Sequence, residues 1–281
     1  MVFGLLVPAI VVAVVLRRAY TDVDDQLVEE WAGAHALALS SNNRAMVRWY
    51  LRTARILRAW GVLAGLLLPE LVDAAFGVDV FGQAQPFFAF FGYLVGALYA
   101  ELALVRRADG SRRLATLVPR EVADYLPRRL LVAQRAVAAA VVLGGAVLLT
   151  MPFDEGVGGS PPSRSSVVVV AALAAVLGLA LERVERWLVQ RPQPFSDAEL
   201  VAADDAIRSQ AVHSVASSGL AMLLLLLGGV LFGFATSDVQ VLRWTMWLPG
   251  LACFYGSIHV CLYYGHRAWR VRRGVSRPAP A

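Results

Sequence analysis

Long apolar runs place the strongest constraint on what this sequence can fold into. Seven of them recur along the chain, and each is long enough, or nearly so, to cross the ~30 Å hydrocarbon core of a bilayer. Inside a bilayer every backbone N–H and C=O group must be hydrogen-bonded within the protein, and a helix achieves this within one segment. The sequence therefore predicts an all-α, polytopic transmembrane helix bundle. The expected spans are residues 2–16, 59–77, 86–105, 130–151, 166–181, 215–235 and 244–265.

The composition agrees with a single integral membrane domain over residues 1–281. The chain is 58% hydrophobic and only 17% charged, which lies outside the usual range of soluble domains. The first run lacks both a positive n-region and a small-residue cleavage site, so we expect an uncleaved first span and no signal peptide. Residues 266–281 come after the last run as a basic cytoplasmic tail.

Arginine supplies all 26 basic residues, and its distribution predicts the orientation of the bundle. Cytoplasmic loops of membrane proteins hold an excess of positive charge. Every arginine except Arg164 and Arg243 falls in the first, third or fifth connection between predicted spans, at the edge of one of them, or in the tail. We therefore expect a multi-pass protein of the cytoplasmic membrane, with its N-terminus outside and its C-terminus inside.

The cytoplasmic connections are predicted to contain short amphipathic helices that lead into the next span. Ser196 and Glu199 match a capping box, so a helix is expected to begin at Asp197, with Asp204 and Asp205 exposed. The first connection predicts two helices with a break near residues 40–43. These connections offer the surface on which a cytoplasmic partner protein would dock.

Four arginines of the first connection form a stripe on one helix face. Arg44, Arg48, Arg52 and Arg55 have the spacing i, i+4, i+8 and i+11. The simpler interpretation is an anchor on anionic lipid headgroups, worth about 1 kcal/mol per arginine. A specific site for a phosphate ligand is the alternative.

Glu101 is the carboxylate that lies most clearly inside a predicted span. Acidic side chains within membranes are rare and are functional candidates by default. Arg106 lies five residues later, roughly 7 Å along a helix, so we expect Glu101 to pair with Arg106 or with Arg135. The alternative is a site for a proton or a cation.

A second candidate site is the stripe Tyr255, His259, Tyr263 and His266 on the last span. Tyrosines near the end of a span are typical of an interfacial aromatic belt, so only Tyr255 and His259 need a further explanation. The simpler interpretation is a buried neutral histidine that is hydrogen-bonded across the bundle, and the alternative is a proton relay or a ligand site. One histidine without a second ligand nearby does not predict a metal, and we expect no cofactor.

Glycines spaced four apart predict places where helices approach closely. The patterns are Gly61 to Gly65, Gly92 to Gly96 and Gly229 to Gly233. Such contacts lie within one bundle or form the seam of a homo-oligomer, and the spacing alone leaves both open.

Two segments carry a resemblance to other sequences. GALYAELALVRR with the later LVPREVADYLPRR, and ELVAADDAIRSQAVHS, resemble stretches of uncharacterised multi-pass membrane proteins of high-GC actinobacteria. The resemblance covers predicted spans three to six. It implies a bacterial membrane protein and carries no activity over to these residues.

Three classes of function stay open. The sequence has no P-loop, no HExxH, no GxSxG and no glycine-rich dinucleotide fingerprint. The favoured class is a small permease, or the membrane component of a transport complex whose energy-coupling subunit is another chain. The alternatives are a non-catalytic regulatory or scaffold protein and an intramembrane lipid-modifying enzyme. Membrane lipids are the expected partners, and no motif for nucleic acid is found.

Overall fold

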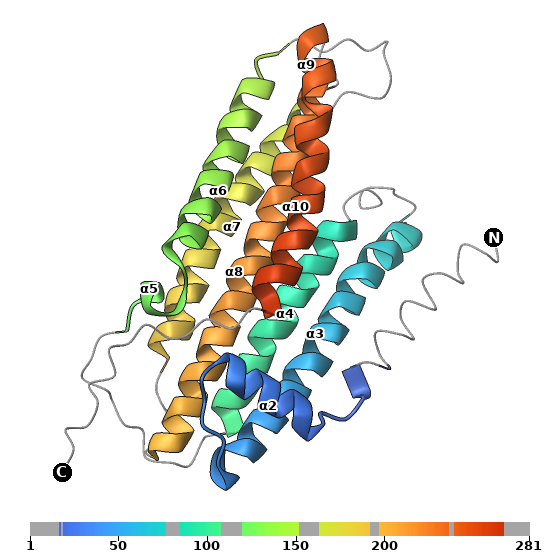
Figure 1. Cartoon of the computed structure of the whole chain (residues 1–281). Helices are drawn as coiled ribbons and strands as arrows, with labels where there is room; N and C mark the ends of the chain where they lie inside the picture. Colours follow the sequence, from blue (N-terminus) through green and yellow to red (C-terminus); the bar gives the residue numbers. More distant parts are fainter. Residues whose placement is uncertain are drawn as a thin grey trace.

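All regular structure in the described part of the chain is helical, which confirms the predicted all-α class. The computed structural model describes residues 17, 19–76, 85–107, 120–151, 163–191, 197–235 and 239–266 (Figure 1). The helices are α2 (Asp25–Ala34), α3 (Ser41–Phe76), α4 (Gln85–Arg107), α5 (Val122–Tyr125), α6 (Arg128–Leu148), α7 (Arg164–Gln190), α8 (Ala198–Ala235), α9 (Gln240–Thr245) and α10 (Trp247–His266).

Fewer helices than the predicted seven are long and apolar enough to cross a membrane. Within the described ranges α6, α7 and α8 meet that requirement, and α4 contributes a shorter apolar segment, Phe87–Ala103. The predicted spans 59–77 and 244–265 fall largely within α3 and α10, and the predicted span 2–16 lies outside the described residues. The length and composition of α6, α7 and α8 are those of membrane helices.

Helix α8 is the centre of the bundle. It packs against α3, α4, α6, α7 and α10, and nearly all of its residues from Ala203 to Leu223 are buried (Figure 1). By contrast, α6 and α7 turn large apolar side chains outward, including Leu143 and Leu179, which are 66% and 73% exposed. Exposed leucine and valine along one face suit a lipid environment, because apolar side chains in contact with acyl chains carry no cost in free energy.

The predicted boundary between an inner-loop helix and the next span is absent. Helix α8 begins at Ala198, where the Asp197 carboxylate accepts a hydrogen bond from the Glu199 N–H (2.8 Å), and it continues without interruption to Ala235. Helix α7 likewise runs on to Gln190, beyond the predicted end at residue 181. The prediction that Asp204 is exposed is therefore wrong: Asp204 is 0% exposed, and Arg191, just after the end of α7, donates to its carboxylate. Asp205 is partly buried.

The first connection folds as predicted, into two helices. Helix α2 ends at Ala34 and α3 begins at Ser41, with Ala36 at a positive φ of 52° between them. Asn43 holds this turn, because its side-chain amide donates to the Ala38 carbonyl (2.8 Å) and its Oδ1 accepts from the Ser40 N–H (2.8 Å). The turn lays α2 against the start of α3.

Helices α3 and α4 touch backbone to backbone, as two of the glycine patterns predicted. A Cβ atom built on Gly61 would lie 2.1 Å from the Gly92 carbonyl oxygen, and one on Gly92 would lie 2.0 Å from the Gly61 carbonyl oxygen. This contact lies within one chain. Gly229 makes no close helix contact within the chain, because a Cβ there would meet nothing within 4 Å, and Gly228 approaches α10 instead; a seam between copies at this pattern stays a prediction.

A substitution at this crossing tests its geometry. We expect Gly92→Ala to lower the free energy of unfolding by about 3 kcal/mol, the upper end of the cost of overpacking, because the added methyl group meets backbone that cannot rotate away. Gly229→Ala is the matched control and should be neutral or slightly stabilising. Unfolding in mixed detergent micelles measures both, and equal stabilities would contradict the close crossing.

Candidate functional site

Four charged side chains are buried together at one end of the bundle. Glu101 near the end of α4, Arg191 just after α7, and Asp204 and Arg208 in the first turns of α8 are each no more than 5% exposed. We call these four residues the buried charge cluster. Charged groups are seldom buried to this degree unless they are paired, because desolvation costs several kcal/mol per ion.

The negative and positive charges of the cluster balance, because two carboxylates pair with two guanidinium groups. Arg191 Nη2 donates to Asp204 Oδ1 (2.8 Å), and Arg191 Nη1 lies 3.3 Å from Glu101 Oε2. Arg208 Nη2 donates to the other Asp204 oxygen (2.8 Å). Burial alone would lower the pKa of Arg191, but the charges of Asp204 and Glu101 outweigh burial and raise it. Two carboxylates and two guanidinium groups thus join α4, the end of α7 and α8.

Arg208 also closes the C-terminal end of α7. Its Nη1 donates to the carbonyl oxygens of Leu188 (3.3 Å), Val189 (2.6 Å) and Arg191 (3.0 Å). The last carbonyls of a helix have no intrahelical donor and carry its partial negative charge, so a buried cation there satisfies both. One side chain therefore fixes the α7–α8 junction.

Two further groups surround the cluster. Asp205 lies 3.5 Å from Arg120 and accepts a hydrogen bond from the Tyr125 hydroxyl (3.2 Å), which connects α8 to α5. Tyr50 of α3 is buried beside Glu101, and burial, reinforced by the Glu101 charge, raises the pKa of the Tyr50 hydroxyl well above its ordinary value. The cluster is thereby enclosed from several sides.

Helix α8 continues from the cluster into its central part with buried polar side chains. They are Ser209, Gln210, His213, Ser214, Ser217 and Ser218, which we call the polar tract of α8. Several bond to their own helix: His213 Nδ1 to the Ser209 carbonyl (2.9 Å) and Ser218 Oγ to the Ser214 carbonyl (2.6 Å). From Arg208 to Ser218 the tract extends roughly 15 Å at ~1.5 Å per residue.

A buried amide and carboxylate on the neighbouring helices meet the tract. Gln134 of α6 donates through Nε2 to Glu185 Oε1 of α7 (3.0 Å) and to the Ala216 carbonyl of α8 (3.1 Å). Glu185 is 1% exposed. The polar interior thus extends across three helices that are otherwise apolar.

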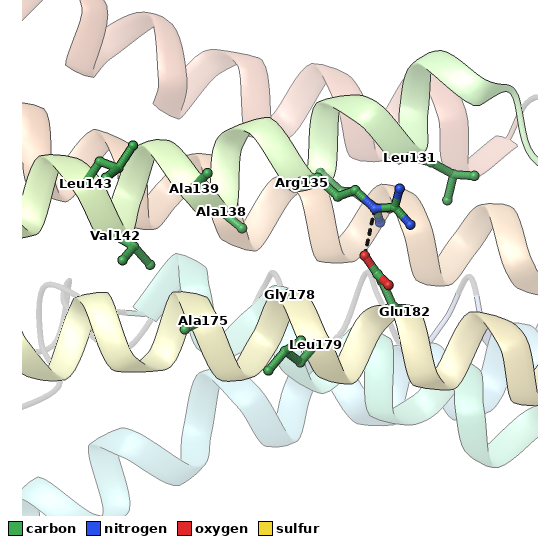
Figure 2. A pocket seen from close by; sticks show the side chains of 11 residues that line it. Leu131, Arg135, Ala138, Ala139, Val142, Leu143, Ala175, Gly178, Leu179 and Glu182 are labelled. Atoms are coloured by element: carbon green, nitrogen blue, oxygen red, sulfur yellow. Dashed lines mark hydrogen bonds and ion pairs between the residues drawn. The ribbon is translucent and has the colours of Figure 1, made fainter.

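The structure confirms that Glu101 is buried and ion-paired, but its partner differs from those predicted. Arg135 pairs with Glu182 instead (2.7 Å; Figure 2), so the predicted pair with Arg135 is wrong. The side chain of Arg106 lies outside the described residues. Arg191 is the one ion-pair partner of Glu101 among the described residues, and the Tyr50 hydroxyl lies beside it. Glu101 is therefore the least satisfied member of the cluster.

Tyr255 and His259 do not join this site. Tyr255 is 67% exposed, and His259 is exposed and stacks on Tyr263 with ring centroids 5.5 Å apart. The expectation of a buried histidine bonded across the bundle is therefore wrong. Among the described residues, no three histidine, cysteine, aspartate or glutamate side chains come together in a way that could hold a metal ion.

The arginine stripe has partners within the chain. Arg44 pairs with Asp25 (2.9 Å) and Glu29 (3.2 Å), and Arg48 also pairs with Asp25. The Arg44 hydrogen bond and the Arg48 charge hold the pKa of Asp25 below its usual range. Arg52 lies 3.9 Å from Asp22, and Arg55 donates to the Thr21 carbonyl (3.3 Å). The segment that leads into α2 and its first turns therefore compete with lipid for these guanidinium groups.

Of the surface grooves on the described bundle, two include arginine in their lining. The groove between α6 and α7 has a volume of about 500 Å³, and Figure 2 shows its apolar wall of alanine, leucine and valine ending at the Arg135–Glu182 pair. The groove beside α3 has a volume of about 420 Å³ and is lined by aromatic, apolar and arginine side chains. The two grooves differ in charge, since the single arginine of the first is paired.

Comparison of the chain with family models, curated proteins and solved structures finds no match. The site must therefore be interpreted from its own residues.

Sequence reasoning missed Arg191, Asp204, Arg208 and Glu185, because they fall between the predicted spans, in a connection expected to be solvated. Two signals were available. Asp204 and Arg208 are spaced i, i+4, and the ten residues after Arg208 include no charged residue, which is unusual for a surface helix.

Removing one charge of the cluster tests whether it holds the fold together. We expect Arg208→Met to cost about 3–5 kcal/mol of unfolding free energy, because Asp204 and the α7 carbonyls lose their donor while buried. Arg186→Met is the control, since Arg186 is exposed and pairs with Glu182 at i−4; it should cost less than about 1 kcal/mol. Similar losses in both variants would mean that the cluster contributes little.

Asp25→Asn tests the competition between α2 and lipid. The change removes the charge that holds Arg44 and Arg48, so we expect a roughly fivefold or greater rise in the preference for phosphatidylglycerol over phosphatidylcholine, at ~1 kcal/mol per arginine released. Quenching of tryptophan fluorescence by brominated lipids measures this preference. Glu30→Gln removes the same charge from the exposed side of α2, and an equal rise there would show that only net charge matters.

Proposed function

We propose that this protein is a small permease, or the membrane component of a transport complex, in the cytoplasmic membrane. The observation that carries the proposal is the polar tract buried inside the central helix α8 and continuous with the buried charge cluster. Polar and ionisable side chains within membrane helices are costly, and they usually face a bundle interior or a water-filled cavity where they mark substrate and ion pathways.

The buried charge cluster would close one end of such a pathway. Its members come from three separate parts of the chain, so breaking the Glu101–Arg191 contact would remove the ion pair between α4 and the end of α7 without disturbing the Asp204 bonds. Glu101 has one ion-pair partner among the described residues whereas Asp204 has two, so the Glu101 charge is the one that protonation or a cation would remove at the lowest cost. We therefore assign Glu101 as the coupling site.

The proposed topology has seven spans, with the N-terminus outside and the C-terminus in the cytoplasm. The distribution of arginine supports this orientation, which would put the cluster at the cytoplasmic end. The sequence has no nucleotide-binding motif, so coupling to ATP would require a second chain that docks on the cytoplasmic helices.

A scaffold protein is the competing interpretation, because a fully paired buried cluster also fixes a helix arrangement. The two differ in whether water reaches the polar tract. A pathway is hydrated in at least one state, whereas a structural core stays dry.

Thiol labelling separates them. Ser217 and Leu223 are both 0% exposed on α8, so each is replaced by cysteine in a chain whose own Cys253 and Cys261 are serine. We expect a membrane-impermeant maleimide to label Ser217→Cys at least about tenfold faster than Leu223→Cys, and Glu101→Gln to accelerate the Ser217→Cys reaction further. Equally slow labelling at both positions, with and without Glu101→Gln, would support a scaffold and reject the pathway.

Native mass spectrometry of protein extracted gently from its host membrane addresses the partner. A stoichiometric ATPase would identify the chain as a subunit. A lone chain or homodimer would identify a self-contained transporter.

A further inference from the structure

The groove beside α3 is built differently from the rest of the surface. Its walls come from four helices: Leu27 and Trp31 of α2, residues between Tyr50 and Val62 of α3, Tyr93 of α4 and Gln210 of α8. Trp31, Tyr50 and Tyr93 give it an aromatic lining with polar tips, and its volume of about 420 Å³ lies in the range of ligand sites.

Arg58 lines this groove without a carboxylate of its own to neutralise it. Its guanidinium carbon lies 5.5 Å from the centre of the Tyr93 ring, a cation–π contact. The groups of the described chain that act on Arg58 are the Tyr93 hydroxyl, the Tyr50 hydroxyl, which also bonds to it, and Glu101, which is already ion-paired with Arg191. The buried Nε of Arg58 has no hydrogen-bond acceptor among the described residues.

The arginines earlier on the same helix show the contrast. Arg44, Arg48 and Arg52 each have an acidic partner from the segment 22–29. In the groove between α6 and α7, Arg135 is bound by Glu182. Arg55 also lines the groove beside α3 and donates to the Thr21 carbonyl, whereas Arg58 supplies a positive charge that no described carboxylate pairs with directly.

One other donor of the same groove is also left without a well-placed acceptor. Trp31 Nε1 is buried, and no described residue accepts a hydrogen bond of good geometry from it, whereas the Tyr50 hydroxyl lies against Glu101 and Arg58. Buried donors are nearly always satisfied, so the two donors Trp31 Nε1 and Arg58 Nε around one groove call for acceptors that the described chain does not supply. An oxyanion with several oxygen atoms offers such acceptors together with the opposite charge.

We infer that the groove beside α3 binds a phosphate group, with Arg58 as its main cation and the Trp31 Nε1 donor as a secondary contact. The phosphate belongs to an anionic phospholipid headgroup or to a free phosphate compound, since both present the same oxygens. The Tyr93 ring holds the Arg58 guanidinium in place. The site borders the charge cluster through Tyr50, and it does not depend on the proposed transport function.

Binding is tested on the purified full-length protein in nonionic detergent, with phosphatidylglycerol added as the lipid probe and inorganic phosphate as the competitor. Native mass spectrometry counts the bound lipid. We expect Arg58→Gln to weaken retention of phosphatidylglycerol by at least about tenfold, the effect of losing a charge-assisted contact. Arg52→Gln removes the same charge from an exposed position of the same helix and should change retention by less than about twofold.

A second variant keeps the test decisive if Arg58→Gln does not fold. Ala59→Trp fills the groove and leaves Arg58 in place, so it should also abolish retention, whereas Ala64→Trp, outside this groove, should not. Displacement by inorganic phosphate would show that the site accepts a free oxyanion, and retention despite phosphate would show that it requires the lipid. Retention that is unchanged in Ala59→Trp, or equally weakened by Arg52→Gln, would overturn the inference.

Discussion

The bonds of Arg208 are the interaction on which the rest of this bundle depends. A fully buried guanidinium on α8 neutralises Asp204 on its own helix and closes the last carbonyls of α7, so it serves as ion-pair partner and helix cap together. Arg191 extends the same network to α4 through Glu101. Any other arrangement of these helix ends would leave several buried charges and carbonyls without partners. The ends of α4, α7 and α8 therefore have one arrangement of low free energy.

Side chains play no part in the contact where α3 crosses α4 at Gly61 and Gly92. There the contact is made by backbone alone, with Gly61 and Gly92 presenting carbonyl oxygens to each other's Cα surface. In lipid, apolar side chains gain little by meeting each other instead of acyl chains, so close backbone packing supplies dispersion contacts that long side chains would prevent. Ion pairs thus fix the helix arrangement at one end of the bundle, and backbone contact at glycines fixes the crossing of α3 with α4.

Periodicity and composition were sufficient to locate the long helices of the described chain, the two-helix first connection and the glycines at which α3 and α4 approach closely, because apolar runs and glycine spacing are local signals. They failed where burial depends on tertiary packing. The sequence around Asp204 and Arg208 is typical of a solvated turn. In the structure α7 and α8 extend past the predicted span ends and bury both residues. For His259 the error was the reverse, because a residue predicted to be buried is exposed. A stripe on one helix does not reveal which side faces the bundle.

The separation of Glu101 from its partner along the chain bears on how the protein is made. The α7–α8 network closes between residues 188 and 208, so it can form as soon as that pair of helices leaves the ribosome. Glu101 is synthesised about ninety residues before Arg191, which at ~5–20 residues per second corresponds to a delay of roughly 5–20 s. During that interval α4 carries an unpaired acid, and its stable place in the membrane is decided only when the last third of the chain arrives.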